Sequence, residues 1–323
     1  MAEFILCDFS SILDAWKQIY INSPHKLLFS SPDWSKVWWD HFGKDNQLYL
    51  GAVVEHDRLI GIAPLRLNSG TLYFIGDDNV CDFLDFVIED GKEDIFFNCF
   101  LEHLMESKFN SLNLAPLLPD SATYEWLSRI VNKFNLSVTC NQVDVVVGMD
   151  LPQTLSSYLA GLKSKYRHEL LRKERRLIEE GDIDFTLDNI DDHNKIELFL
   201  RFFRESRKDK NKFLTPSMEA FFKNIIEVTQ KLNILRMGIL QLNSVPVAAT
   251  LCFLYQNDLY LYNSGYDPDY RWLSVGLLSK YYCIKRSIDN NLRRFDFLRG
   301  GEKYKFHLGG KEVPLYRCII SNG

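Results

Sequence analysis

The segment YDPDYRWLSVGLLSKYY, residues 266–282, combines a cationic side chain with small residues at the predicted start of a helix. Arg271 is followed by Ser274 and Gly276, so little side-chain bulk covers the unpaired amides of the first helical turn. Those amides, with the partial positive charge of a helix N-terminus, favour a phosphate or diphosphate. The same residues also suit a serine that caps a helix and a glycine that packs against a strand. Both interpretations stay open.

A second polar cluster follows a predicted buried strand in the segment FDFLRGGEKYKFHLGG, residues 295–310. Glu302 and Tyr304 come just after a Gly-Gly turn, and a carboxylate beside a phenol can accept and donate a proton. Their cationic neighbours Arg299 and Lys305 are candidates for binding a substrate. The same residues equally suit a structural ion network around a tight turn.

Two acidic residues of the first half, Asp82 and Asp85, lie in the apolar segment NVCDFLDF. Burial raises the pKa of a carboxyl group, which suits a general base. We therefore consider Asp82 a candidate base and Asp85 a candidate ligand for the ammonium or hydroxyl groups of an acceptor. Capping and turn formation are the alternative roles for both residues.

A strongly basic stretch, KSKYRHELLRKERR, joins the two halves of the chain. An exposed helix face with internal ion pairs to Glu169 and Glu174 explains this composition without a further function. Functionally, its cations, among them Arg167, suit the phosphates of a cofactor, a phosphorylated or lipid-linked acceptor, an acidic carrier protein or tRNA.

The elements that must position these residues are predicted from a pattern that occurs twice. Residues 47–76 and 234–265 each indicate three short antiparallel strands joined by turn-forming residues. In each half, helical sequence precedes the meander, and helix, strand, helix and strand follow it. This order predicts an α+β fold of two tandem domains, each a mostly antiparallel mixed sheet flanked by helices. We place the domains at residues 1–150 and 151–323, with a linker helix at residues 163–180.

These features resemble the GNAT-type N-acetyltransferases and, more specifically, the tandem-GNAT proteins of the CelD/BioF-like branch. The resemblance rests on Arg271-x-x-Ser274-x-Gly276 after a meander, and on the segments KYRHELLRKERRL, YNSGYD through SVGLL, and FDFLRGGEKYKFHLG. The family pattern has glycine where this chain has Ser274, a departure that keeps a non-catalytic scaffold among the alternatives. The same double fold is used by the Fem-type aminoacyl transferases.

The resemblance implies that acyl-CoA, such as acetyl-CoA, is a co-substrate of the second domain. Its site is then formed by Arg271, Leu273, Ser274, Val275 and Gly276. Acyl transfer is expected where the strand of residues 295–299 separates from the last meander strand, with Tyr262 beside that fork, Glu302 as base and Tyr304 as acid. Because the first meander is followed by acidic sequence, we expect the first domain to shape the acceptor pocket.

The implied function is transfer of an acyl group from acyl-CoA, or from an acyl carrier protein, to an amine. By resemblance, the acceptor is a small molecule or a glycan precursor, such as an amino sugar in cell-surface polysaccharide biosynthesis. The alternatives are a Fem-like transferase that uses aminoacyl-tRNA and a non-catalytic GNAT-like scaffold. The net acidity and the lack of a long inserted helical hairpin argue against tRNA.

Composition and absent motifs argue against several other classes of protein. The 323 residues are 46% hydrophobic with a net charge of −5, which is typical of a globular protein and does not favour nucleic acid or membrane binding by the whole chain. The sequence has no run of 18 apolar residues, so we expect no membrane span. It also lacks a basic leader, so we expect no signal peptide. The scattered cysteines, without CxxC, predict reduced thiols and a cytoplasmic location. HExxH, Walker, GxSxG and GxGxxG motifs are absent, and no metal is expected.

Overall fold

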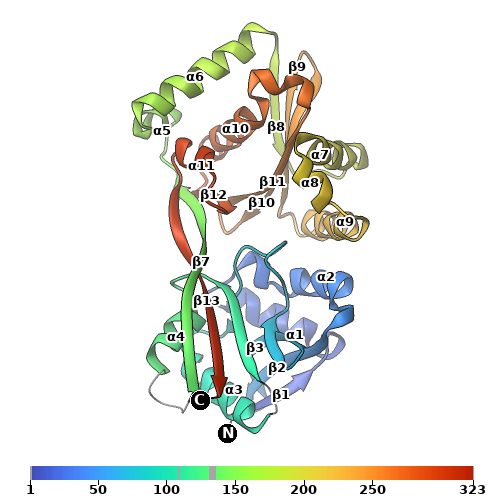
Figure 1. Cartoon of the computed structure of the whole chain (residues 1–323), viewed down its shortest axis with the longest axis vertical. Coiled ribbons are helices and arrows are strands. Elements are labelled where there is room, and N and C mark those ends of the chain that lie inside the picture. Colours follow the sequence, from blue (N-terminus) through green and yellow to red (C-terminus); the bar gives the residue numbers. More distant parts are fainter. Residues whose placement is uncertain (1, 108–109, 131–135, 323) are drawn as a thin grey trace. The chain divides into compact units, whose positions relative to one another are not determined.

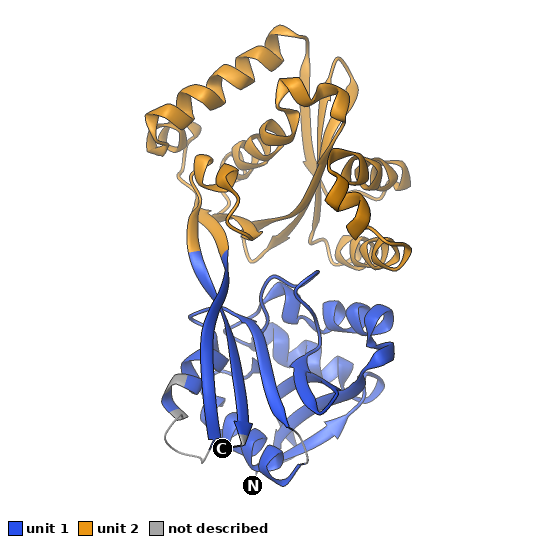
Figure 2. Ribbon diagram, viewed as in Figure 1, with its two compact units in different colours: residues 1–145, 313–323 blue, residues 146–312 orange. Residues whose placement is uncertain are grey.

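The computed structural model describes residues 2–107, 110–130 and 136–322, and the chain forms two compact units (Figures 1 and 2). Unit 1 comprises residues 1–145 and 313–323, and unit 2 comprises residues 146–312. The division at residue 150 expected from the sequence places residues 313–323 with the second domain, whereas their contacts place them in unit 1. The reason is a strand pairing between distant parts of the chain, which no local pattern reveals.

The sheet of unit 1 starts with four antiparallel neighbours, β1 (Ala2–Cys7), β2 (Gln47–Glu55), β3 (Arg58–Asn68) and β4 (Thr71–Phe74). β4 runs parallel to β6 (Ser111–Leu117), and β6 pairs antiparallel with β13 (Lys311–Asn322). A short strand, β5 (Val87–Ile88), pairs with β3. The helices of unit 1 are α1 (Phe9–Asn22), η1 (Leu28–Ser30), α2 (Pro32–Phe42), η2 (Gly43–Asp45), α3 (Glu93–Glu106) and α4 (Ala122–Ile130).

The sheet of unit 2 has the same order. Its antiparallel strands are β8 (Ile183–Asp188), β9 (Leu235–Leu242), β10 (Val245–Tyr255) and β11 (Asp258–Tyr266). β11 runs parallel to β12 (Arg294–Arg299), which pairs antiparallel with the end of β7 (Leu136–Asp150). The helices are α5 (Leu155–Gly161), α6 (Ser164–Glu179), α7 (His193–Ser206), α8 (Lys208–Phe213), α9 (Pro216–Lys231), η3 (Pro268–Leu273), α10 (Val275–Asp289) and α11 (Lys303–His307).

Both units therefore repeat one plan, in which four antiparallel strands are followed by a fifth that is parallel to the fourth and a sixth that is antiparallel to the fifth. The sixth strand comes from the other half of the chain in each case: β13 in unit 1 and residues 146–150 of β7 in unit 2. The α+β fold of two tandem domains with mixed sheets is thereby confirmed.

The hairpin turns adopt the conformation that joins tightly paired antiparallel strands. In three of them, two successive residues have φ between 50° and 66°, the left-handed values that a two-residue turn of type I′ requires. The pairs are His56-Asp57, Asn243-Ser244 and Gln256-Asn257. These turns set the register of the meanders, so each strand presents one face to the core.

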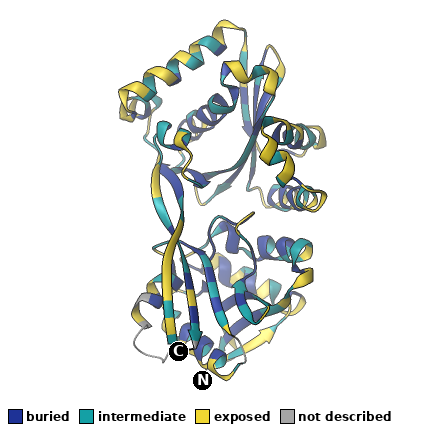
Figure 3. Cartoon of the chain, in the orientation of Figure 1, coloured by how far each residue is buried: buried dark blue, intermediate teal, exposed yellow. Residues whose placement is uncertain are grey.

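The helices of unit 2 differ in how much of their surface is buried (Figure 3). α10 is buried along most of its length, and Val275, Leu278 and Tyr281 are at most 1% exposed. In contrast, α6 buries only Leu170 and Leu177 and exposes most of its charged side chains. The start of α10 is therefore held rigidly against the sheet, whereas α6 presents a charged surface.

The expectation that all cysteines are reduced is wrong. Cys140 on β7 and Cys318 on β13 form a disulfide within unit 1. Because 178 residues separate them, sequence spacing could not identify the pair. The other cysteines are free thiols.

Among the helices of the described ranges, none combines the length and the apolar character that a membrane span requires.

Candidate active site

The strands β11 and β12 form a fork in unit 2. They pair in parallel only from Asp258 opposite Arg294 to Tyr260 opposite Asp296. Beyond this point lies a cavity of about 420 Å³, which both strands line. The residues that the two strands contribute are Leu261, Tyr262, Asn263, Ser264, Tyr266, Phe297 and Arg299.

A β-bulge lies at the fork. Along β10, the partner on β11 changes from Asn263 for Leu251 to Leu261 for Cys252, so Tyr262 has no opposite residue. Bulges are common beside active sites because they redirect a side chain. Tyr262 lines the cavity, and its ring packs against Phe222 and Phe253.

The start of α10 forms another wall of the same cavity. Ser274 adopts a left-handed φ of 60°, and no side chain caps the helix. The Ser274 carbonyl accepts hydrogen bonds from the amides of Leu277 and Leu278, at 2.9 and 3.0 Å. Among the described residues, no hydrogen bond uses the amides of Val275 and Gly276. Both donors therefore remain unused at the positive end of the helix, and of these two residues only Gly276 lines the cavity.

Gly276 and Arg271 complete this end of the cavity. A Cβ at position 276 would lie 2.7 Å from Cδ1 of Tyr266, so glycine is needed for close packing of the ring on the helix. Arg271 lines the cavity from η3, and its guanidinium has no hydrogen bond or ion pair within the part of the chain that the structure describes. The free Gly276 amide and the free guanidinium of Arg271 line the same cavity, and such groups are suited to binding an anion such as phosphate.

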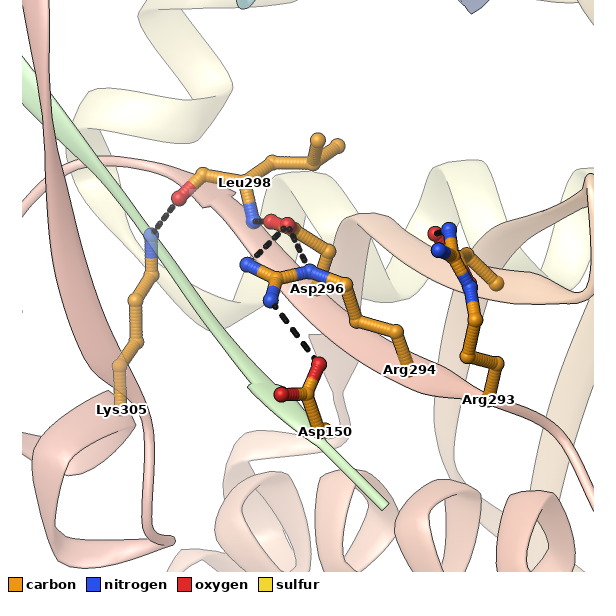
Figure 4. A network of polar contacts seen from close by, with 7 residues as sticks. Asp150, Arg293, Arg294, Asp296, Leu298 and Lys305 are labelled. Carbon is orange, nitrogen blue, oxygen red and sulfur yellow. Dashed lines mark hydrogen bonds and ion pairs between the residues drawn. The ribbon is translucent and has the colours of Figure 1, made fainter. Parts of the chain in front are cut away.

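A polar network supports β12 behind the fork (Figure 4). The buried Asp296 accepts a hydrogen bond from the Leu298 amide at 2.8 Å and pairs with Arg294 at 3.2 Å. Arg294 also reaches Asp150 of β7 at 3.5 Å. Burial raises the pKa of Asp296 even though Arg294 opposes the effect. Leu298 has a φ of 60°, a strained conformation for a non-glycine residue, and the network holds it in place.

Lys305 ties the turn after β12 to the strand. It is 2% exposed, and its Nζ donates to the carbonyls of Leu298, Arg299 and Gly300 at 3.0, 2.6 and 2.9 Å. It also pairs with Glu302 at 3.0 Å. Since its three donors are used within the chain, the contacts of Lys305 are those of the structural ion network that the sequence also suggested.

Glu302 and Tyr304 line the cavity beside this turn. The Glu302 side chain is 51% exposed and can therefore exchange protons with solvent or a ligand. Burial, together with the charge of Glu302, raises the pKa of Tyr304 well above its ordinary value. The phenol thus stays protonated at neutral pH.

Two lysines of the cavity were missed by sequence reasoning. Lys280 on α10 is 8% exposed, donates to the Gly276 carbonyl at 2.6 Å, and lies 5.2 Å from the ring centroid of Tyr304. Lys210 on α8 donates to the Ser264 carbonyl. Burial lowers the pKa of Lys210 to about 7, with a contribution from the charge of Lys280, and lowers that of Lys280 to about 8. For Lys280, the signal in the sequence was a lysine on a largely buried helix, α10.

Most site residues proposed from the sequence meet in this cavity, namely Tyr262, Arg271, Ser274, Gly276, Arg299, Glu302, Tyr304 and Lys305. Leu273 and Val275 are at most 1% exposed and do not line the cavity, so the structure does not place either residue against a ligand there. Arg167, on α6, does not line this cavity. Arg176 of α6, not singled out before, donates to the carbonyl of Trp272 next to the start of α10.

The first-half candidates Asp82 and Asp85 belong to unit 1. Asp85 is 1% exposed and accepts hydrogen bonds from the Phe86 amide, at 2.8 Å, and from the Thr123 hydroxyl. Burial raises its pKa to about 6. These contacts match the capping and turn-forming interpretation of Asp85. Asp82 is half-buried and does not line the fork cavity.

A larger cavity of about 700 Å³ lies between α6, β8 and α10 of unit 2. Carboxylates predominate on its walls, including Glu174, Glu179, Asp182, Asp184 and Asp289. Its charge disfavours a phosphate, so the fork cavity is the better candidate for an anionic ligand. In the described ranges, no group of three or more His, Cys, Asp and Glu side chains could hold a metal ion.

Comparison with known proteins identifies a match over part of the chain and similar folds over the whole chain. Residues 164–306 match the family model of the GNAT acetyltransferase domain. FemX is similar in structure, with a TM-score of 0.66 at 10% identity over 98% of this chain and 96% of that chain. A conserved protein of unknown function from Bacteroides thetaiotaomicron gives 0.62 at 14% identity, with 100% of each chain covered.

A C-terminal domain (DUF2156) from Agrobacterium fabrum, whose name assigns it to a lysylphosphatidylglycerol synthetase, gives a TM-score of 0.60 at 11% identity, covering 97% of this chain and 92% of that chain. No curated protein matches the sequence. At these identities the solved structures establish the fold. The chain therefore has a fold of the GNAT superfamily, similar to that of FemX, and its residues 164–306 match the model of the GNAT acetyltransferase domain.

Proposed function

We propose that this chain is an acyltransferase that moves an acyl group from acyl-CoA, or from an acyl carrier protein, to an amine acceptor. One observation carries the proposal: a single cavity of unit 2 connects Arg271 and the free amide of Gly276 at the start of α10 with Glu302 and Tyr304 at the fork. An anion site joined to an acid–base pair is what transfer from a phosphate-bearing thioester requires.

The donor end of the cavity fits the diphosphate of CoA. The amide of Gly276 and the guanidinium of Arg271 offer donors that the chain itself does not use. Ser274 replaces the glycine of the family pattern without closing this site, because its hydroxyl is turned toward Arg176, whose Nη2 lies 3.4 Å away. The serine therefore does not favour the scaffold alternative.

The residues of the fork divide the proton transfers between them. CoA supplies the thioester, whose C–S bond breaks as the amine nitrogen forms the new C–N bond. The half-exposed Glu302 takes one proton of the acceptor ammonium, directly or through water, so that the neutral amine can attack. Tyr304 donates its proton to the departing sulfur and takes up the second proton that the nitrogen loses as the amide forms. The raised pKa of Tyr304 keeps that proton in place until the thiolate forms. The proposed acceptor is an amino sugar of a cell-surface polysaccharide or its precursor.

The test is release of free thiol from acetyl-CoA in the presence of a panel of amines and amino sugars. Glu302→Gln and Tyr304→Phe should each lower kcat by about 10² or more, since each removes a proton-transfer group. The KM for acetyl-CoA should stay within about twofold, because neither residue contacts the diphosphate. Glu312→Gln, an exposed carboxylate of unit 2 outside the cavity, is the matched control. Unchanged kcat in both variants would refute these roles.

A Fem-like transferase that uses aminoacyl-tRNA is the second candidate. The likeness to FemX and the basic surface of α6 favour it. Burial lowers the pKa of His307, and the positive charges of Lys165, Lys173 and Lys303 lower it further. The surface near this histidine is therefore positively charged, as binding to tRNA would require. Transfer that requires charged tRNA and is lost after RNase treatment would support this candidate over an acyl-CoA enzyme.

A further inference from the structure

The fork cavity carries an excess of positive charge. Its charged side chains are six cations, Arg207, Lys210, Arg271, Lys280, Arg299 and Lys305, and one carboxylate, Glu302. Arg207 binds Asp209 through two hydrogen bonds of 3.0 and 2.6 Å, Lys305 pairs with Glu302, and Arg299 also has a partner within the chain. On the walls of the cavity itself, the cations outnumber the carboxylates.

Lys210 and Lys280 stand out among these cations. Neither has a carboxylate within ion-pair distance in the described part of the chain, although burial alone disfavours an ammonium group. Each ammonium has one hydrogen bond, to the carbonyl of Ser264 or of Gly276, and so keeps two donors for a ligand. Two such side chains in one cavity indicate a ligand that supplies the missing negative charge.

The position of the two lysines connects this charge with the acceptor. Ser264 is two residues from the bulged Tyr262, and Lys280 lies above the ring of Tyr304, so both lysines are at the fork. The start of α10 has other donors for the donor diphosphate, namely Arg271 and the amide of Gly276. An acceptor amine arrives as an ammonium ion, which these lysines repel unless the same molecule also carries an anion.

We infer that the acceptor of the proposed transfer carries an oxyanion, a carboxylate or a phosphate, which Lys210 and Lys280 bind beside Tyr304. This inference rests on the proposed function and narrows its substrate class. It selects amines that carry an acidic group, such as a phosphorylated or carboxylated amino sugar, and disfavours purely cationic amines.

The test measures acceptor binding by calorimetry without any acyl donor. The probes are glucosamine, glucosamine 6-phosphate and the corresponding aminouronic acid, so the two anions are tested separately. At least one anionic sugar should bind about tenfold more tightly than glucosamine, as expected for one charge-assisted contact. Lys210→Met and Lys280→Met should each remove that preference, whereas Lys212→Met, an exposed lysine of the same short helix α8, should not.

Thermal unfolding separates loss of binding from loss of folding. Each methionine variant should be at least as stable as the wild type, because an apolar side chain replaces a buried ammonium without a carboxylate partner. Equal affinities for the three sugars, or a preference that persists in both methionine variants, would overturn the inference. If thiol is released but anionic acceptors are not preferred, the inference about the acceptor fails and the proposed function stands. If anionic sugars bind preferentially but no thiol is released, only the proposed function fails.

Discussion

The carboxyl group of Asp85 is the clearest case in unit 1 of a titratable group in an unfavourable environment. It is enclosed in the core, and its Oδ2 has no hydrogen-bond partner, while Oδ1 accepts from Phe86 and Thr123. Burial raises its pKa from 3.8 to about 6. The folded state therefore binds a proton more tightly than the unfolded state, and the stabilisation is largest when the carboxyl is protonated.

We predict that Asp85→Asn removes a pH dependence from the stability of unit 1. The contribution of Asp85 is fully present below about pH 4 and is lost as the pH rises through about 6. Relative to the variant, the wild type should lose at most about 3 kcal/mol between pH 4 and pH 7, from a shift of about two pKa units. Urea titrations followed by tryptophan fluorescence report mainly on unit 1, because Trp272 is the only tryptophan outside it. Parallel pH profiles for both proteins would contradict this prediction.

At the scale of single residues, the sequence is informative where a residue type has meaning within a local pattern. Arg271, Ser274 and Gly276 stand at a recognisable helix start, and the structure brings them into one cavity with Glu302. Lys210 could not be found in this way, because a lysine in a polar segment predicts an exposed side chain. Its burial depends on the packing of α8 against β11, which is tertiary.

Local sequence patterns also predict some of the helices and strands and miss others. The helix whose start the sequence predicts near Ser274 and Gly276 corresponds to α10 (Val275–Asp289), and both meanders form because their turn residues accept positive φ. The linker helix expected at residues 163–180 corresponds to α6 (Ser164–Glu179). β1 and β8 were not predicted, since each is a six-residue strand at the edge of its sheet with weak apolar alternation.

The fork is also a property of elements rather than of single residues. β11 and β12 separate after three paired positions, and the positive φ of Leu298 turns the chain away from the parallel partner. Lys305 then fixes the turn through three carbonyls. Strain held by buried polar contacts is a common way of keeping an active site open.

For the whole molecule, the exchange of the sixth strands makes each unit depend on chain from the other half. The disulfide between Cys140 and Cys318 lies in unit 1, and the loop that it closes contains all of unit 2. Neither feature could be predicted, since both join residues more than a hundred positions apart.

We predict that reducing this disulfide destabilises unit 1 and leaves ligand binding in unit 2 intact. Closing a loop of this length stabilises by up to about 5 kcal/mol in the chain-entropy model. Cys140→Ser should reproduce the effect of reductant on urea unfolding, and reductant should not lower the stability of that variant further. Titration of the denatured, unreduced protein should find two thiols fewer than the seven cysteines of the sequence. Seven free thiols would disprove the disulfide.

The most direct measurement is calorimetric titration of CoA into the wild type and into Arg271→Glu. The wild type should bind, and the variant should bind at least about tenfold more weakly, because the change removes a charge-assisted contact and adds repulsion at the start of α10. Arg175→Glu, an exposed charge reversal on α6, should bind like the wild type. A wild type that does not bind CoA at millimolar concentration, or an Arg271→Glu variant with unchanged affinity, would contradict the donor site and the transferase with it.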